Sequence, residues 1–408
     1  MALDVEAVRA EFPALLITDG GRPRIYFDAP GGTQACRRAI DAMRHHLETG
    51  TANSGGAFAT AVATDAMSEA AHQAMADLLG GDRSEIAFGQ NMTSLTFALS
   101  RSLGRRWADK GGEIVVTRLD HDANVAPWLL LARDIGLEVK WLDFDPETGA
   151  LRLDELPGLL GPNTRLVAVG GASNALGTLN PLEEIVRIVR ANSDALVFVD
   201  AVQSVPHVLT DVRASGCDFL ACSPYKFFGP HQGVLWGREA LMEELEAYKV
   251  RPADSHPAAI RFETGTPSYE GQAATIGAVE HIASLGGEAG SRRDRIRAGM
   301  AAIQEHERAL GERFLGGIAG LQRLRLYGPP TTQGRVPTFS VTVDGMTARE
   351  AAELLAERGI FAWSGNFYAK EAIDRLGLAA SGGLLRIGFC HYSSEAEVDT
   401  LIEALAEL

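Results

Sequence analysis

Two charged residues stand where apolar runs of the sequence come to an end. Asp200 closes the run ALVFVD, and Lys226 follows the run CDFLAC across the stretch SPYK, which begins at Ser223. An apolar strand that stops at a turn needs no charge, so the two side chains indicate a site between neighbouring strands. An amine that attacks an aldehyde and an acid that keeps a pyridine nitrogen protonated are both requirements of pyridoxal phosphate (PLP). The pattern therefore predicts PLP joined to Lys226 as a Schiff base, with Asp200 at the pyridine nitrogen.

Both residues also have a plainer interpretation. A single lysine is most often a surface residue in a loop. Asp200 would serve equally as the N-cap of a helix that starts near Ala201. Gln203, three residues further on, adds a polar group beside Asp200 and favours the cofactor site.

Hydroxyl, imidazole and amide side chains supply the other groups that PLP needs. Thr93 and Ser94 begin a helical pattern, and a helix N-terminus attracts a phosphate; the alternative is that Thr93 is only an N-cap. Ser223 would add a further hydroxyl. His121 follows the strand-like run EIVVT and is a candidate to lie flat on the ring, although a lone histidine is often structural. Asn174 is a candidate donor to the phenolic oxygen.

Arg386 is the candidate for binding the substrate. Its planar guanidinium suits the carboxylate of an amino acid. On a strand through RIGFC, Cys390 would share a face with Arg386 and would point toward the same site, or else be a small core thiol. The glycine-rich stretches APGGTQ (29–34) and NSGGA (53–57) predict loops that approach the site closely.

The elements that must position these residues alternate between strand-like and helix-like patterns. The strand-like runs lie at 85–88, 113–117, 138–142, 164–170, 195–200, 217–222 and 233–237, with helical patterns at 93–109, 123–135 and 181–191 between them. Continuous apolar strands separated by helices predict a mostly parallel seven-stranded α/β sheet that is covered on both faces. Ligands gather at the carboxyl ends of such strands, where the polar residues stand.

A second, smaller α/β unit follows the glycine-rich stretch SLGGEAG. A helical stretch at 291–318 leads to a strand at 338–345, a helix at 347–358 and a strand at 384–394. We predict an N-terminal helical segment at 1–20 that packs on the small domain, a large cofactor-binding domain at 21–290 and a small C-terminal domain at 291–408.

Composition limits the function classes. The net charge of −15 and the absence of a basic stripe argue against nucleic-acid binding. The four cysteines have neither a CxxC pair nor a metal-ligand spacing, so we expect free thiols in a reducing compartment and no metal site. The N-terminus reads as an acidic helix and no run is long enough to cross a membrane, so the expected location is the cytoplasm.

Seven segments carry a family resemblance: IYFDAPGGTQ, LDHDANVAPW, SNALGTLNP, VFVDAVQSVPH, CDFLACSPYKFFGPHQG, RFETGTPSYEG and LLRIGF. In this order the chain resembles the class V aminotransferase group, PLP fold type I, on its cysteine desulfurase and selenocysteine lyase branch. The resemblance implies Lys226 as the Schiff-base lysine, Asp200 at the pyridine nitrogen, Gln203 near the phenolic oxygen and His121 on the ring. It also implies Thr93 and Ser223 at the phosphate, and Thr266 reaching the phosphate of a partner subunit in a homodimer.

Two positions depart from that group. Tyr225 stands where the group has a histidine before the lysine, which alters a phosphate contact. The stretch WSGNFYAKE (363–371) replaces the loop that carries the nucleophilic cysteine of a desulfurase, and Tyr368 stands near the expected place. Persulfide chemistry needs a thiolate to attack sulfur, so we expect an enzyme that lacks this step.

Three functions remain open from the sequence. The first is a lyase that forms a carbanion at Cα of an amino acid and releases sulfur or selenium from Cβ. The second is an aminotransferase or epimerase that uses the same carbanion. The third is a PLP-binding partner subunit without turnover.

Overall fold

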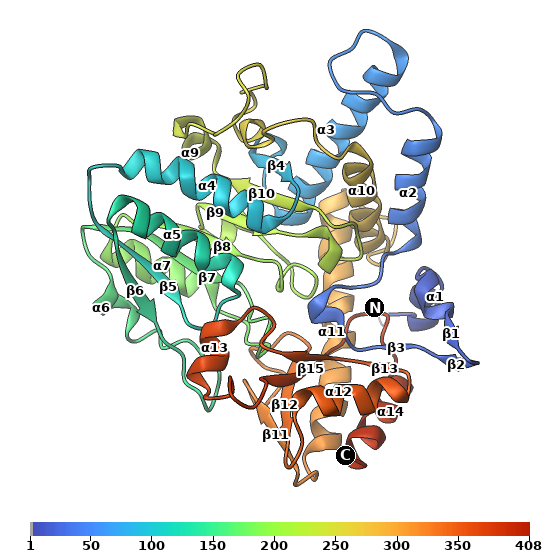
Figure 1. Cartoon of the computed structure of the whole chain (residues 1–408). Coiled ribbons are helices and arrows are strands. Elements are labelled where there is room, and N and C mark those ends of the chain that lie inside the picture. Colours follow the sequence, from blue (N-terminus) through green and yellow to red (C-terminus); the bar gives the residue numbers. More distant parts are fainter. Residues whose placement is uncertain (1–2) are drawn as a thin grey trace.

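The computed structural model describes residues 3–408 and is organised around a seven-stranded sheet (Figure 1). The order across the sheet is β4 (Ile86–Gly89), β10 (Gly233–Gly237), β9 (Phe219–Cys222), β8 (Leu196–Asp200), β7 (Thr164–Gly170), β5 (Glu113–Thr117) and β6 (Glu138–Leu142). Only β10 runs antiparallel to its neighbours. The predicted mostly parallel α/β sheet is therefore confirmed, with strand ends within two residues of those expected.

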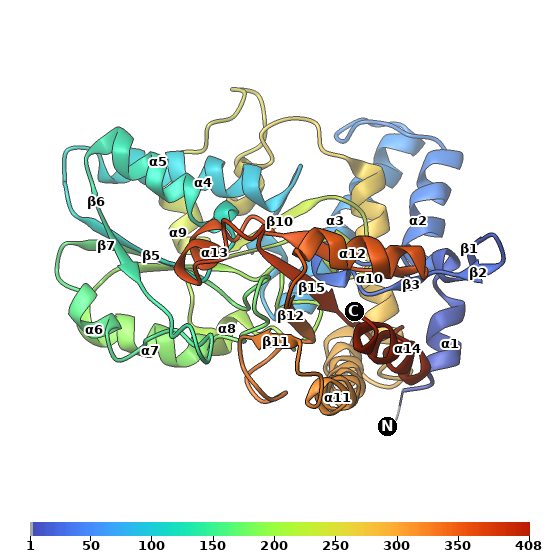
Figure 2. The same cartoon turned by 60° about the horizontal axis from the view of Figure 1, so that its bottom comes forward.

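Helices cover both faces of this sheet, as Figure 2 shows. On one face lie α4 (Met92–Trp107) and α5 (Ala126–Ile135); on the other lie α6 (Leu156–Leu159), α7 (Leu182–Asn192) and α8 (Val212–Ser215). Alternate residues of one strand enter different cores: Val197 and Val199 join one cluster, and Phe198 joins the other. Burial on both faces explains why the strands read as continuous apolar runs.

A layer of helices packs beside the β4 and β10 side of the sheet. It contains α2 (Arg37–Glu48), α3 (Ala59–Leu79) and α10 (Tyr269–Ser284), and α10 also contacts the long helix α11 (Arg292–Ile318). The short α9 (Glu239–Glu244) follows β10. In Figure 1, α11 runs from this layer down to the C-terminal part of the chain.

The C-terminal part forms a four-stranded antiparallel sheet. Its order is β11 (Leu324–Tyr327), β12 (Thr338–Val343), β15 (Leu384–Gly388) and β14 (Trp363–Gly365), with α12 (Ala348–Glu357), α13 (Lys370–Arg375) and α14 (Glu395–Ala406) around it. The strand expected at 384–394 is wrong beyond Gly388. The pairing of β12 with β15 ends at Thr338 and Gly388, and a turn at 390–393 follows.

The N-terminal residues contact this small unit. Helix α1 (Val5–Ala10) places Arg9 against Glu397 of α14, with Nη1 and a carboxylate oxygen 2.9 Å apart. A hairpin of β1 (Thr18–Asp19) and β2 (Arg22–Pro23) follows, and β3 (Ile25–Tyr26) pairs in parallel with β13 (Ile360–Phe361). The predicted boundaries at residues 21 and 291 remain predictions. Within residues 3–408, no helix has the length and apolar character to cross a bilayer.

Candidate functional site

A cavity of about 740 Å³ lies where the carboxyl ends of the central strands face β14 and β15. Six of the predicted site residues line it: Thr93, His121, Asn174, Tyr225, Lys226 and Arg386. Pro30 and Gly31 of the predicted close-approach loop 29–34 line it too, whereas Asn53 and Ser54 of the second glycine-rich loop line a separate cavity. The structure thus brings together residues from Pro30 to Arg386, which lie far apart in the chain.

Lys226 is buried at the end of a short 3₁₀ turn that follows β9, with 6% of its surface exposed. The plainer interpretation as a surface lysine is therefore wrong. Its Nζ donates a hydrogen bond to the carbonyl oxygen of Pro30. Burial, together with the charge of Arg386, lowers the pKa of Lys226 from 10.5 to about 7, although the charge of Asp200 acts in the opposite direction. A large share of the amine is uncharged at neutral pH and able to act as a nucleophile or base.

Asp200 is buried at the last position of β8, one strand away from β9. One carboxylate oxygen accepts a hydrogen bond from the N–H of Val202 at 3.0 Å, so the carboxylate does cap the turn that follows, although residues 202–207 form turns and not the helix that the alternative assumed. Burial raises the pKa of Asp200 to about 6, which the nearby Lys226 opposes. A cation beside it, such as a protonated pyridine, would stabilise the charged form.

Three predicted cofactor contacts leave buried polar atoms without a partner among the described residues. These atoms are Ser223 Oγ, Asn174 Oδ1 and Gln203 Oε1. The other ends of the two amides are engaged: Asn174 Nδ2 donates to the carbonyl oxygen of Phe367 at 2.8 Å, and Gln203 Nε2 to the hydroxyl of Thr338 at 3.2 Å. The free atoms are one hydroxyl, which can donate or accept, and two amide oxygens, which accept, so a polar ligand could pair with them.

Two rings stand beside Lys226. The Nδ1 atom of His121 accepts a hydrogen bond from the N–H of Ala123 at 3.0 Å, and burial with the charges of Lys226 and Arg386 lowers the pKa of His121 to about 4. His121 is therefore neutral at pH 7 and adds no charge to the cavity. The Tyr225 ring is stacked on His231 at a centroid distance of 4.8 Å, and burial raises the pKa of the tyrosine to about 12.

Arg386 is buried on β15 and held on two sides. Its Nη1 donates to the carbonyl oxygen of Asn174 at 2.9 Å, and its Cζ lies 4.1 Å from the centroid of the Phe367 ring. Its Nε has no hydrogen-bond partner among the described residues. Burial lowers the pKa of Arg386 to about 9, so the guanidinium stays charged at neutral pH. The guanidinium lines the cavity, where it can bind a carboxylate.

Ser94 and Thr266 lie apart from Lys226. They line a different cavity, of about 350 Å³, together with His231. The N–H of Ser94 donates to Asn91 Oδ1 at 2.8 Å, so Asn91 caps α4 and the alternative of Thr93 as the N-cap is wrong. A phosphate contact of Ser94 and a partner contact of Thr266 remain predictions.

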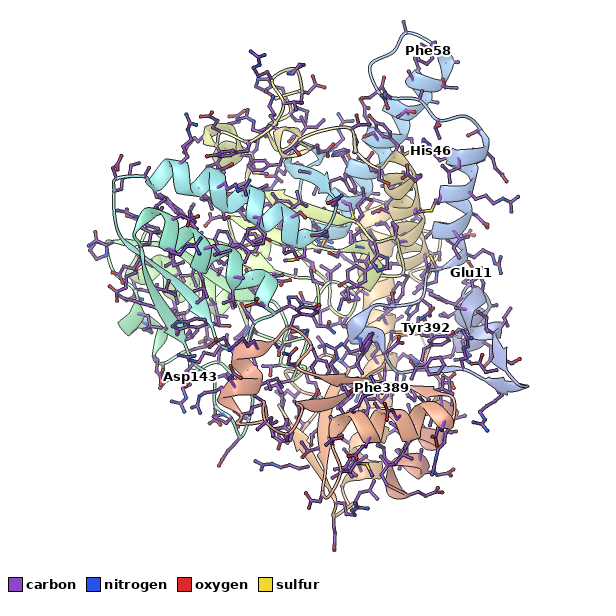
Figure 3. The ribbon with its side chains drawn as sticks, viewed as in Figure 1. Glu11, His46, Phe58, Asp143, Phe389 and Tyr392 are labelled. Carbon is purple, nitrogen blue, oxygen red and sulfur yellow. The ribbon has the colours of Figure 1, made fainter. Side chains whose placement is uncertain are left out.

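Cys390 does not share the face of Arg386. The strand ends at Gly388, and the N–H of Cys390 donates to Ser393 Oγ at 3.2 Å inside the turn. The thiol is fully buried, in the same core cluster as Tyr392, and burial raises its pKa. The prediction that Cys390 points toward the site is wrong, and the alternative of a core thiol is confirmed. Figure 3 labels Phe389, which precedes this turn, and Tyr392, which lies within it.

The sequence reasoning missed several residues at the site. Asp28 follows the apolar run IYF, and burial raises its pKa to about 6. Asp120 accepts a hydrogen bond from the N–H of Gly170 at 3.0 Å, and burial raises its pKa to about 7. An acid directly after an apolar run, the same signal as at Asp200, would have found Asp28. Phe367 had no signal, because its contact with Arg386 depends on the tertiary fold.

Comparison with known proteins identifies the family. The model of class V aminotransferases matches residues 25–401. The chain belongs to the class V aminotransferase family. It is a PLP-dependent enzyme.

Curated relatives and solved structures agree with this assignment. An uncharacterised protein of Mycobacterium tuberculosis is 32% identical over 410 residues, covering 100% of both chains. A probable cysteine desulfurase of Streptomyces coelicolor is 32% identical over 426 residues, covering 99% of this chain and 96% of that one. The structure of a cysteine desulfurase from Thermococcus onnurineus NA1 has a TM-score of 0.87 at 27% identity, covering 100% of this chain and 98% of that one. The fold is PLP fold type I, as the resemblance implied.

Proposed function

We propose that this chain is a desulfurase-like lyase that breaks the bond from Cβ to sulfur or selenium of an amino acid without a persulfide on the protein. One observation carries the proposal: a buried lysine and a buried arginine share a cavity in which the loop 366–368 presents aromatic rings and no thiol. The relatives named as cysteine desulfurases support the desulfurase-like part. The fate of the leaving group is the part specific to this chain.

Buried polar residues around the cavity would hold PLP. Lys226 would bind it covalently, and Asp200 would keep a proton on its ring nitrogen. Asn174 and Gln203 would face its phenolic oxygen. Bound PLP supplies an aldehyde that joins the substrate amine and a pyridinium ring that takes up the electron pair at Cα.

Hydroxyl and ring groups complete the proposed cofactor site. Thr93, Ser94, Ser223 and Tyr225 would contact the phosphate. The neutral ring of His121 would lie on the cofactor ring and exclude water from it.

The side chains that act on the substrate are Arg386 and Lys226. The guanidinium of Arg386, which lines the cavity, would bind the substrate carboxylate and fix its orientation. With its lowered pKa, the Nζ of Lys226 would remove the proton from Cα, and the electron pair left on the substrate would expel the substituent at Cβ. None of the four cysteines, all of which belong to the described part of the chain, lines the cavity. The substituent would then leave without transfer to a protein thiol.

A homodimer in the cytoplasm is part of the proposal. Thr266 is exposed and lies away from its own Lys226 cavity, which suits a contact with the phosphate bound by a partner subunit. The four buried free cysteines suit a reducing compartment.

The test is a product analysis with a panel of amino acids. Mass spectrometry should find pyruvate and ammonium, which mark a lyase. Pyridoxamine phosphate would mark an aminotransferase, racemised substrate an epimerase, and bound PLP without turnover a partner subunit; each of these would contradict the proposal. Lys226→Ala should abolish turnover and borohydride trapping of PLP, whereas Lys110→Ala, at an exposed lysine, should leave both unchanged.

A further inference from the structure

The segment Asn366–Tyr368 forms one wall of the cavity and is fixed in place. The carbonyl oxygen of Phe367 accepts from Asn174 Nδ2 at 2.8 Å, and the carbonyl oxygen of Tyr368 accepts from the N–H of Asp122 at 2.7 Å. The N–H of Tyr368 donates to Asn366 Oδ1 at 3.1 Å. The segment is therefore tied to two loops of the central sheet and is not a free arm.

The backbone of this segment adopts an unfavourable conformation. Phe367 and Tyr368 both have φ of +56°, in the left-handed region that residues other than glycine rarely adopt. Two consecutive residues in this region persist only where the surroundings hold them, and such places are often functional.

Two ion pairs, one near each end of α13, hold this helix, which follows the segment Asn366–Tyr368. Arg118 Nη1 and a carboxylate oxygen of Glu371 are 2.6 Å apart, and Arg375 Nε and Asp143 are 2.9 Å apart. Figure 3 labels Asp143 close to α13. The segment Asn366–Tyr368 and helix α13 are thus both bonded to loops of the central sheet.

The segment Asn366–Tyr368 fixes the orientation of the Arg386 guanidinium. The Phe367 ring covers one face of the guanidinium at 4.1 Å, while Asn174 takes Nη1. The guanidinium lines the cavity in a plane that the ring sets, and there it can bind a carboxylate. Phe367 is thus a positioning residue for the proposed carboxylate contact.

Beyond this contact, the wall of the cavity is aromatic. Trp363 is 53% exposed and Tyr368 is 73% exposed, although both line the cavity. Phe97 and Pro127 add further carbon surface. Apart from Asp122, the described residues that line the cavity carry no charge other than Lys226 and Arg386, which the substrate uses. Exposed aromatic rings at a cavity favour an apolar ligand group in contact with them.

We infer that the substrate is an L-amino acid whose Cβ carries a thioether ending in an apolar or aromatic group, which Trp363 and Tyr368 select. This inference rests on the proposed lyase function. The reaction balances without an acceptor thiol: R–S–CH₂–CH(NH₃⁺)–COO⁻ and water give R–SH, pyruvate and ammonium. The C–S bond breaks with its electron pair on sulfur, which gains a proton, and the oxidation of Cα is balanced by the reduction of Cβ, so no external oxidant or reductant is needed.

A binding experiment tests the selectivity without turnover. L-Homophenylalanine and L-2-aminobutyrate carry the apolar and the minimal side chain, and neither has a leaving group at Cβ. Isothermal titration of the PLP-loaded protein should give at least ~10-fold tighter binding of L-homophenylalanine, the scale of a hydrophobic pocket contact. Equal or reversed affinities would overturn the inference.

Variants locate the preference. Tyr368→Asn, which tolerates a positive φ, should reduce the ratio of the two affinities by ~3-fold or more, the scale of one aromatic contact. Phe367→Asn should weaken the binding of both ligands to the same extent, because Arg386 would lose the ring that packs on its guanidinium. Leu354→Ala, at an exposed apolar residue of α12, should change neither affinity. A ratio unchanged in Tyr368→Asn would overturn the assignment of Tyr368.

A kinetic comparison of two substrates distinguishes failure of the substrate preference from failure of the proposed lyase function. S-Benzyl-L-cysteine should yield pyruvate with a higher kcat/KM than L-cysteine. If neither gives pyruvate while L-homophenylalanine still binds more tightly, the lyase proposal fails and the selectivity stands. If L-cysteine has the higher kcat/KM, the lyase proposal stands and the selectivity is overturned.

Discussion

Lys226 and Asp200 experience the same burial with opposite consequences for their pKa values. Burial disfavours the charged form of each, so the pKa of the amine falls to about 7 and that of the acid rises to about 6. Groups shifted toward neutral pH are the ones that proton transfer requires. The two shifts give measurable expectations for each residue.

The lowered pKa of Lys226 predicts how PLP attachment depends on pH. Only the uncharged amine attacks an aldehyde, and with a pKa of about 7 its uncharged fraction rises between pH 6 and pH 8. The rate at which PLP attaches to the apo-protein, followed by absorbance, should rise over this range and then level off. A rate that still climbs tenfold between pH 8 and pH 9 would show an ordinary lysine with a pKa near ~10.4.

Substitution of Asp200 tests the acid at the pyridine nitrogen. Asp200→Asn keeps the size and can still accept from the N–H of Val202, but it cannot hold the proton on the ring. Turnover should fall by at least ~100-fold, the scale of a lost electrostatic contact in the transition state, while PLP remains bound. Wild-type turnover in this variant would assign Asp200 to the turn alone.

At the scale of elements, the sequence predicts those parts of the site that local pattern determines. The apolar runs that end at Asp200 and lead to Lys226 become β8 and β9, and their polar ends meet because the two strands are parallel neighbours. The loop 29–34 reaches Lys226, whose Nζ donates to the carbonyl oxygen of Pro30, as its glycine and proline content predicted. Strand periodicity and turn chemistry are sufficient for these features.

The remaining features depend on contacts between distant segments. The turn that removes Cys390 from β15 follows an apolar run, so the sequence pattern continues where the strand pairing stops. Phe367 meets Arg386 and Asn174 only after β14 and the central sheet come together. No local pattern encodes such contacts, which is why the contact of Phe367 with Arg386 could not be predicted.

A buried histidine pair joins α10 to the chain after β15 and predicts acid sensitivity. His281 and His391 are hydrogen-bonded through their Nε2 atoms at 2.8 Å, and the Phe12 ring packs on both. Burial lowers the pKa of His281 to about 4 and that of His391 well below 6.5. The unfolded chain protonates both near pH ~6.5, so folding stability should fall as pH drops below that value and continue to fall toward pH 4.

Denaturation at two pH values measures this effect. For His281 alone, the free energy of unfolding should fall by about 2 kcal/mol between pH 7 and pH 5. The double variant His281→Gln, His391→Gln should lose less stability over this interval than the wild type. The control His45→Gln, at an exposed histidine, should lose as much stability as the wild type. An unchanged pH dependence in the double variant would mean that the pair does not titrate on unfolding.

At the scale of the whole molecule, one end carries exposed apolar side chains. Phe58 is 60% exposed and Val62 56% exposed on or beside α3, and Val250 is 59% exposed on the segment that leads to Thr266. Figure 3 shows Phe58 at the outer end of the molecule. We expect these side chains to contact a second copy, whose Thr266 would then reach toward the PLP site.

Sedimentation tests this assembly. The wild type should be a homodimer, and Phe58→Glu with Val62→Glu should shift it toward monomer and reduce turnover, because the site would lack the partner contribution. Leu354→Glu, on the exposed face of α12, should remain dimeric. A fully active wild-type monomer would refute the assembly and the role of Thr266.

The most direct test of the whole account is the fate of sulfur when the enzyme processes L-cysteine. Transfer of sulfur to a protein thiol leaves alanine and a persulfide, whereas elimination leaves pyruvate, ammonium and free sulfide. After turnover, thiol trapping and digestion, mass spectrometry should find pyruvate and no persulfide on Cys36, Cys217, Cys222 or Cys390, each of which is buried. Alanine together with a persulfide on Cys390, both lost in Cys390→Ala, would contradict the account.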